Sequence, residues 1–311
     1  MIWAYISVCL IYGTTFWAIR AGDEAGMPPF LFASVRFAVA GMIILLAVYF
    51  HGINSFPRSS KVYAKLALIG VFNTTSVFAV VYLVEQYIPS CYTALMASTM
   101  PIVTLILGNI RHNEGLTRIQ YMGLVSGFIG MFIVAWTGIT QDIPHWILSS
   151  IALIVVHVLA AIGVMQSRSL SASRISPSVI SGFQSLFGSI GLFLLAVVTK
   201  GLSLQHVSSW HAGLWALLYL TFFGSVIAST LYFWLVKVIG PTIASTWTYV
   251  SPIVAIIVGH FWDHEQITTW TVVGTAVILS GILMSNSQSL RVAFRQKLVA
   301  TQKSKNTLGS Q

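Results

Sequence analysis

The chain has 311 residues, and only 7% of them are charged whereas 56% are hydrophobic. An ordinary soluble domain carries about 25% charged residues, so this composition argues against a soluble globular enzyme, a nucleic-acid-binding protein and a disordered chain. The mean hydropathy of +0.85 favours the lipid bilayer as the solvent of the chain.

Apolar segments recur at nearly regular intervals and are separated by polar, proline and glycine stretches. A helix that crosses a bilayer needs about 20 apolar residues, so the chain has room for ten such helices but for no separate soluble domain. The segments lack the alternation of barrel strands, and we predict an all-α polytopic membrane protein with ten transmembrane helices. The predicted segments are residues 2–19, 30–50, 64–84, 90–109, 119–137, 147–167, 177–198, 212–236, 242–260 and 269–288.

The basic residues indicate how these segments are oriented. If successive connections alternate between the faces of the membrane, one face receives both termini and 13 of the 16 basic residues. By the positive-inside rule this face is cytoplasmic, and we expect the chain in the cell membrane with both termini inside. The basic residues on this face are Arg58, Lys61, Lys65, Arg111, Arg118, Arg168, Arg174, Lys237, Arg291, Arg295, Lys297, Lys303 and Lys305. Residues 290–311 form a basic tail, which we expect to contact anionic lipid headgroups and not nucleic acid.

The two halves of the sequence resemble each other. The pairs that share one register are Pro101 and Pro252, Gly108 and Gly259, Glu114 and Glu265, Gly123 and Gly274, and Gly130 and Gly281. A one-residue gap upstream aligns Leu83-Val84 with Leu235-Val236, and weaker matches align Pro29 with Pro177 and Arg36 with Gln184. Each half holds five segments, an odd number, so the second half must be inverted relative to the first. We predict two inverted five-helix units, residues 1–140 and 141–289.

The sequence resembles the drug/metabolite transporter superfamily, in its ten-helix EamA-type branch. The resemblance covers about residues 2–288 and rests on three features. They are Tyr12-Gly13-Thr14-Thr15-Phe16-Trp17, Pro29 with Arg36, and the repeated Pro…Gly…Glu…Gly…Gly pattern of the fourth, fifth, ninth and tenth segments. The resemblance implies a multi-pass exporter of small metabolites, amino acids or drugs that hydrolyses no ATP.

In the first three segments, the embedded Arg36 is the most informative residue. It either binds an anionic part of a substrate or pairs with an acid that gating releases, since embedded charges in transporters usually line the route. The alternatives are that it snorkels to the headgroups or ties two helices together permanently. Glu85, at the end of the third segment, lies at a matching depth and is the expected gating partner. Trp17, Asn73, Ser76 and Tyr82 are further candidate substrate-binding residues, although Trp17 and Tyr82 also suit an interfacial aromatic belt.

The middle of the chain contributes a histidine and a glycine motif. His157, near the centre of the sixth segment, either couples proton movement to transport or is a neutral residue that hydrogen-bonds between helices. Gly123 and Gly127 form a GxxxG motif, which we expect to pack helices within one chain more readily than to join two chains.

The second half supplies the remaining candidates. Gln184, Tyr232, Trp247 and Tyr249 are expected to line an aromatic cavity that orients a small zwitterion or amphiphile. Pro101 and Pro252 predict matched helix kinks that take part in gating, or else are prolines that the helices tolerate.

A membrane-embedded enzyme and a receptor are the alternatives to transport. The first would need a catalytic constellation such as HExxH, paired intramembrane aspartates or a nucleophile with its base, and the sequence contains none. We therefore expect no enzymatic activity and no cofactor or metal, and a monomer or weak homodimer whose partners are its substrate and membrane lipids. A secondary transporter that works by alternating access fits the sequence best.

Overall fold

The computed structural model describes residues 1–50, 56–112, 117–140, 145–173, 175–262 and 268–285, and within these ranges it contains helices and no strands. The side chains of Pro101 and Tyr249, and the whole of residues 290–311, lie outside the described residues. The described elements, in which η marks a π-helix, are α1 (Ile2–Glu24), α2 (Pro29–Phe50), α3 (Ser60–Gly70), η1 (Val71–Ser76), α4 (Val77–Val84), α5 (Ser90–Ala97), α6 (Met100–His112), α7 (Arg118–Thr140), α8 (Trp146–Ala172), α9 (Pro177–Val198), α10 (Trp210–Tyr219), η2 (Leu220–Ala228), α11 (Ser229–Ile239), α12 (Pro241–Ala244), α13 (Trp247–Trp262) and α14 (Thr269–Ser285).

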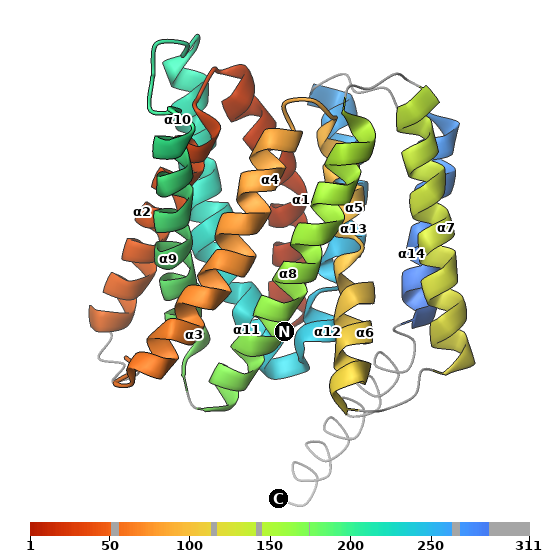
Figure 1. Ribbon diagram of the computed structural model, residues 1–311, viewed down its shortest axis with the longest axis horizontal. Coiled ribbons are helices and arrows are strands. Elements are labelled where there is room, and N and C mark those ends of the chain that lie inside the picture. Colours follow the sequence, from red (N-terminus) through yellow and green to blue (C-terminus); the bar gives the residue numbers. More distant parts are fainter. Residues whose placement is uncertain (51–55, 113–116, 141–144, 174, 263–267, 286–311) are drawn as a thin grey trace, which may run out of the picture.

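The helices form one bundle in which the long rods lie roughly parallel (Figure 1). At one end of the bundle α2 packs along α9, and at the other end α7 packs along α14. Between these pairs, α1 contacts α13 and η2, and α8 contacts α6 and η1.

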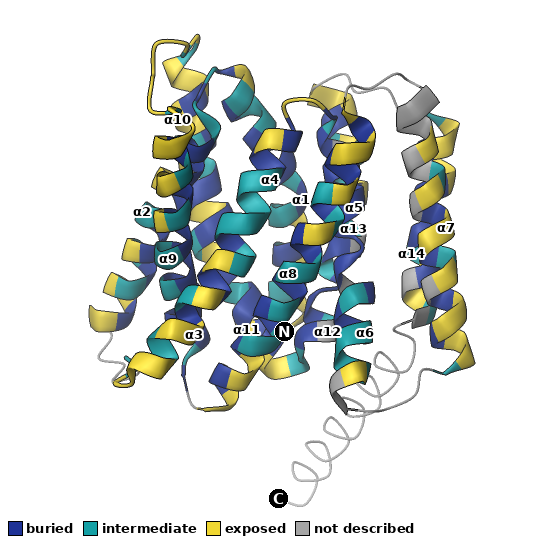
Figure 2. Cartoon of the chain, viewed as in Figure 1, coloured by how far each residue is buried: buried dark blue, intermediate teal, exposed yellow. Residues whose placement is uncertain are grey.

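Exposed residues lie along the outer faces of the helices (Figure 2), and many of them have large apolar side chains. Phe128 on α7, Leu194 on α9 and Trp215 on α10 are each more than half exposed, which a soluble monomer rarely tolerates over so wide a surface. Seven described segments are long and apolar enough to cross a membrane, and two shorter apolar helices accompany them. The predicted all-α membrane fold is confirmed, and helix covers most of the described part of each predicted apolar segment.

Two of the predicted segments are not continuous α-helices, because η1 interrupts residues 64–84 and η2 interrupts residues 212–236. A π-helix accommodates an extra residue per turn, and such distortions are frequent at functional sites. Hydroxyl groups satisfy backbone carbonyls around η1. Ser76 Oγ donates to the oxygen of Val71 at 2.9 Å, and Thr75 Oγ1 donates to the oxygen of Gly188 on α9 at 3.0 Å.

Two further segments are broken, at different positions relative to their prolines. Residues 90–109 split between α5 and α6, just before Pro101, whereas residues 242–260 split between α12 and α13, and α13 then continues through Pro252. Pro101 thus occupies the first turn of α6, where its missing N–H costs no helical hydrogen bond, whereas Pro252 lies within α13. A matched bend of the helices at the two prolines stays a prediction. A gating role of either proline stays a prediction.

Glycines allow α7 and α14 to approach closely. A Cβ atom built on Gly130 would lie 2.9 Å from the carbonyl oxygen of Gly274, and one built on Gly281 would lie 2.6 Å from that of Gly123. In lipid, burying apolar surface between helices gives little free energy, so helices associate mainly through close packing of this kind. The glycine motif of α7 thus packs two helices of the same chain together, as expected.

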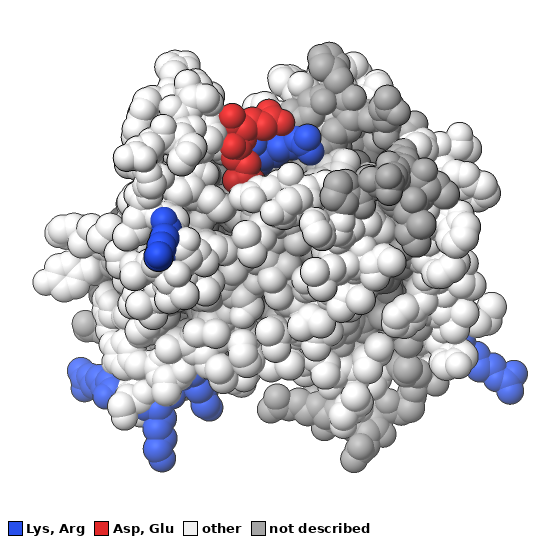
Figure 3. Space-filling model, turned by 45° about the horizontal axis from the view of Figure 1, so that its top comes forward, with Lys and Arg blue, Asp and Glu red and all other residues white. Residues whose placement is uncertain are grey.

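Charged side chains lie mainly toward the two ends of the bundle. Figure 3 shows acidic side chains in a hollow toward the top of the view with basic atoms beside them, and further basic side chains at the left and toward the lower edge. Asp23 and Glu24 end α1, and Arg20 Nε donates to Glu24 Oε1 at 3.1 Å. The described basic residues at the opposite helix ends are Lys61 and Lys65 on α3, Arg118 on α7, Arg168 on α8 and Lys237 on α11.

Candidate functional site

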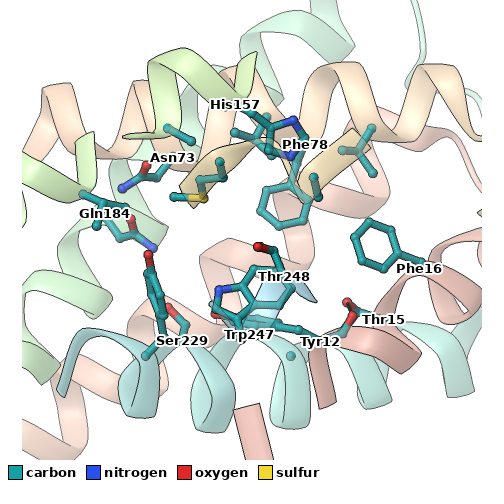
Figure 4. Close-up of a pocket in the computed structure, with 18 of the residues that line it drawn as sticks. Tyr12, Thr15, Phe16, Asn73, Phe78, His157, Gln184, Ser229, Trp247 and Thr248 are labelled. Atoms are coloured by element: carbon teal, nitrogen blue, oxygen red, sulfur yellow. Dashed lines mark hydrogen bonds between the residues drawn. The ribbon is translucent and has the colours of Figure 1, made fainter. Parts of the chain in front are cut away.

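A cavity of about 120 Å³ lies inside the bundle, among helices of both halves of the chain (Figure 4). Its lining draws on two buried apolar clusters, one that includes Ile19 and Val81 and another that includes Met100 and Val164. The polar and aromatic side chains that line it are Tyr12, Thr15, Phe16, Arg36, Phe37, Asn73, Phe78, His157, Gln184, Ser229, Tyr232, Phe233, Trp247 and Thr248. A mostly apolar cavity with a few convergent polar groups is the usual form of a small-molecule site.

The one guanidinium of this lining belongs to Arg36 on α2, which is only 1% exposed. Its Nε donates to Ser225 Oγ on η2 at 2.8 Å, and its Nη1 donates to Tyr82 OH on α4 at 3.2 Å. The rings of Phe37 and Phe78 lie 4.7 and 5.0 Å from its Cζ atom. Neutral hydroxyls and aromatic faces therefore hold this cation in place, and its charge remains available to an anion in the cavity.

Two amide side chains, Asn73 of η1 and Gln184 of α9, lie toward the left of Figure 4. Among the described residues, neither the Oδ1 nor the Nδ2 atom of Asn73 has a hydrogen-bond partner, and the same holds for Oε1 of Gln184. Gln184 is 6% exposed. An unsatisfied buried amide costs about 1–3 kcal/mol, so these atoms favour a polar group in the cavity.

Aromatic rings from three helices close another side of the cavity. The ring centroids of Tyr12 on α1 and Trp247 on α13 are 4.4 Å apart, and those of Tyr12 and Tyr232 on α11 are 6.4 Å apart. The described residues provide no hydrogen-bond partner for Trp247 Nε1 or for Tyr232 OH. This group offers an apolar aromatic surface with two polar atoms, which suits a small amphipathic molecule.

His157 on α8 also lines the cavity. Its Nδ1 lies 2.6 Å from the backbone oxygen of Leu153. Because a carbonyl only accepts, Nδ1 carries the proton, and in the neutral ring Nε2 is left as an acceptor. This hydrogen bond lies within α8, and the predicted role of His157 in proton coupling stays a prediction.

The remaining candidates lie outside the cavity lining. The ring of Trp17 packs 6.2 Å from that of Trp262, and Ser76 bonds within η1. Tyr82 is fully buried and reaches the cavity only through Arg36. Glu85 is buried one helical turn after Tyr82, and its pairing with Arg36 stays a prediction. The side chain of Tyr249 is outside the described residues.

Sequence reasoning did not select Tyr12, Phe78 or Gly224 as site residues. Tyr12 stood only within the family motif, and Phe78 is one apolar residue among many. Ser225, which follows Gly224, could have been found from the repeat, because the register of Leu83-Val84 with Leu235-Val236 aligns it with Asn73. No three His, Cys, Asp or Glu side chains within the described ranges come together as a metal site.

Comparison with known proteins decides the family. A model of the EamA-like transporter family matches residues 1–136 and, separately, residues 147–287. The chain therefore belongs to the EamA-like transporter family. As a member of this family it is a membrane transporter, and the apolar helices of the structure agree with that assignment.

Proteins with similar sequences are also named as transporters. The uncharacterized inner membrane transporter YedA of Escherichia coli strain K12 is 27% identical and is matched over 88% of this chain and 87% of its own length. The uncharacterized transporter YoaV of Bacillus subtilis strain 168 is 22% identical over 90% and 94% of the two chains. A solved crystal structure of a protein superposes with a TM-score of 0.68 at 17% identity and covers 93% of this chain and 97% of its own, which supports the fold alone.

Proposed function

We propose that the chain is a secondary transporter that moves a small organic metabolite, such as an amino acid or an amphiphilic drug, across the cell membrane by alternating access. The observation that carries this proposal is the cavity. It lies between helices of both halves and exposes Arg36, Asn73 and Gln184 to a space that is otherwise apolar. A binding site at the interface of two repeats is the arrangement that alternating access needs.

The contacts of the bundle support two inverted units, residues 1–140 and 141–289. If α1 corresponds to α8 and α6 to α13, the contact of α1 with α13 exchanges with that of α8 with α6. The two glycine contacts between α7 and α14 exchange in the same way, because Gly123 corresponds to Gly274 and Gly130 to Gly281. The two separate matches of the family model give a third, independent support. We infer ten membrane-spanning rods, five in each unit.

The direction and orientation rest on other grounds. Basic residues gather at the helix ends opposite Asp23 and Glu24. Under the positive-inside rule, this distribution supports a cytoplasmic location of the basic ends. Because α1 starts at the basic end, the N-terminus is cytoplasmic in this proposal. An outward direction of transport follows from the resemblance to exporters.

Flux measurements on purified protein test the proposal. Vesicles that contain the protein are preloaded in turn with amino acids, nucleobases or toxic organic cations, and exit is followed with and without the same unlabelled solute outside. We expect protein-dependent exit that external solute accelerates, because exchange returns the loaded carrier. Exit of every solute at the rate of protein-free vesicles would contradict transport.

A further inference from the structure

We propose that the cavity contains two polar subsites that the repeat makes equivalent in position but different in charge, and that together they select a small monocarboxylate with a neutral hydrogen-bonding group at its other end. The anionic subsite is formed by Arg36 and Ser225, and the neutral subsite by Gln184 and Asn73. This inference rests on the proposed transport function and names its substrate class.

The correspondence of the subsites follows from the repeat. The register that aligns Pro29 with Pro177 aligns Arg36 with Gln184, and the register of the third and eighth segments aligns Asn73 with Ser225. In space, η2 of the second half packs on α2 of the first half, and η1 of the first half packs on α9 of the second. Arg36 bonds Ser225 across the first of these contacts. The second contact brings the helices of Gln184 and Asn73 together, with a Cβ built on Gly70 only 2.8 Å from the Gln184 carbonyl oxygen.

The first subsite suits a carboxylate. Nε and Nη1 of Arg36 donate to hydroxyls, whereas Nη2 lies beside Gly224 of the cavity lining. A Cβ atom built on Gly224 would be only 2.9 Å from Nη2, so the missing side chain leaves this edge of the guanidinium uncovered. An N–H of a guanidinium bonds a carboxylate more strongly than any neutral acceptor, and most strongly where water is excluded.

The second subsite suits a neutral group. Asn73 presents a donor and an acceptor, and Gln184 a further acceptor, for which the described residues provide no partner. An amide or hydroxyl of a ligand would satisfy them, whereas a second carboxylate would meet two acceptor oxygens and no cation there. The lining of the same cavity also includes the rings of Tyr12 and Trp247, so we expect the ligand to carry a short apolar middle.

The size of the cavity limits the ligand. A dry cavity of about 150 Å³ holds one benzene molecule, and the cavity here is about 120 Å³. The cavity is therefore on the scale of a compound with roughly six non-hydrogen atoms. Succinamate, with a carboxylate and an amide on two methylene groups, has this form. Succinamide lacks its charge, and butyrate lacks its amide.

Equilibrium binding of these three radiolabelled probes to the purified protein in detergent tests the subsites. We expect succinamate to bind at least about tenfold more tightly than succinamide or butyrate, because each of these loses one subsite. Arg36→Gln should remove the preference over succinamide, and Gln184→Leu should remove the preference over butyrate. The control variants Arg20→Gln and Gln205→Leu change the same residue types outside the cavity and should retain both preferences.

An exchange of residues between the subsites gives the sharpest result. In the double variant Arg36→Gln/Gln184→Arg the charge moves to the equivalent position beside Asn73, so the preference for succinamate over succinamide should return. If Arg36→Gln does not yield folded protein, Gly224→Ala is measured in its place. It should weaken succinamate and butyrate and spare succinamide, since its methyl group would press on Nη2.

Three outcomes would overturn the two subsites. They are equal or absent binding of all probes to the unaltered protein, a uniform loss of all probes in both single variants, and a double variant that behaves as Arg36→Gln does. Flux of succinamate into vesicles separates this inference from the transport proposal. If succinamate binds selectively but is not transported, the two subsites are supported and the transport proposal is contradicted. If all three probes are transported at the same rate, only the two subsites are contradicted.

Discussion

Arg36 shows how a single buried charge organises its surroundings. Removing a guanidinium from water costs several kcal/mol, and here two hydroxyls and two aromatic rings offset part of that cost. Tyr82, which accepts a hydrogen bond from Arg36, lies on α4 one helical turn before Glu85.

A charge exchange tests whether Glu85 and Arg36 act as a pair. Arg36→Glu and Glu85→Arg should each reduce transport strongly, because each leaves like charges buried at one depth. The double variant should recover part of the lost flux in reconstituted vesicles. A double variant as inactive as the worse single variant would show that the two residues do not act together.

A second substitution addresses the role of His157. Gln at this position retains a donor for the Leu153 carbonyl but does not titrate. If His157 couples protons to transport, His157→Gln flattens the dependence of flux on pH between about 5 and 8. His211→Gln, on the exposed surface of α10, serves as the control. An unchanged pH profile in His157→Gln rules coupling through this residue out.

The residues of the site were partly predictable from the sequence. Arg36, Asn73, His157 and Gln184 stand out because a polar group in an apolar segment is costly and needs a reason. The sequence alone does not show which face of a helix points inward, because neighbouring helices decide that. Trp17 therefore satisfied the same pattern as cavity residues although it packs against α13 near its end.

Among the helices, hydrophobic length predicts existence and position but not continuity. Apolar periodicity does not reveal the two π-helices or the two breaks. At η1, for example, Thr75 Oγ1 donates to the backbone oxygen of Gly188 on α9, and such a contact between helices cannot be read from the periodicity. The glycine pattern was more informative. It predicted a close contact between helices, and α7 and α14 meet through these residues.

Substitution of Gly281 tests this contact. A methyl group would overlap the backbone of α7, with its Cβ 2.6 Å from the oxygen of Gly123. We expect Gly281→Ala to destabilise the protein by about 1–3 kcal/mol and to lower its apparent melting temperature in detergent. Gly108→Ala on α6 is the matched control, since a Cβ atom there meets nothing within 4 Å. Equal melting temperatures of the two variants would argue against a packed contact between α7 and α14.

At the scale of the whole molecule, two features predict the membrane topology. They are the odd number of predicted segments in each half and the distribution of the basic residues. Both ends of the chain should face the cytoplasm. Fusion of a reporter that is active only inside the cell should give full activity at Met1 and at Gln311. Activity at one terminus and not at the other requires an odd number of membrane crossings and contradicts two five-helix units.

A single labelling measurement tests whether the cavity is exposed alternately to the two sides of the membrane. Thr248, which lines the cavity, is replaced by cysteine in a chain whose Cys9 and Cys91 are alanine, and a membrane-impermeant thiol reagent is applied from each side of oriented vesicles. Two inverted halves that rock about the cavity predict labelling from both sides, and a transported solute should slow both reactions. Labelling from one side only, whatever solute or gradient is present, would contradict a route that runs between the two halves.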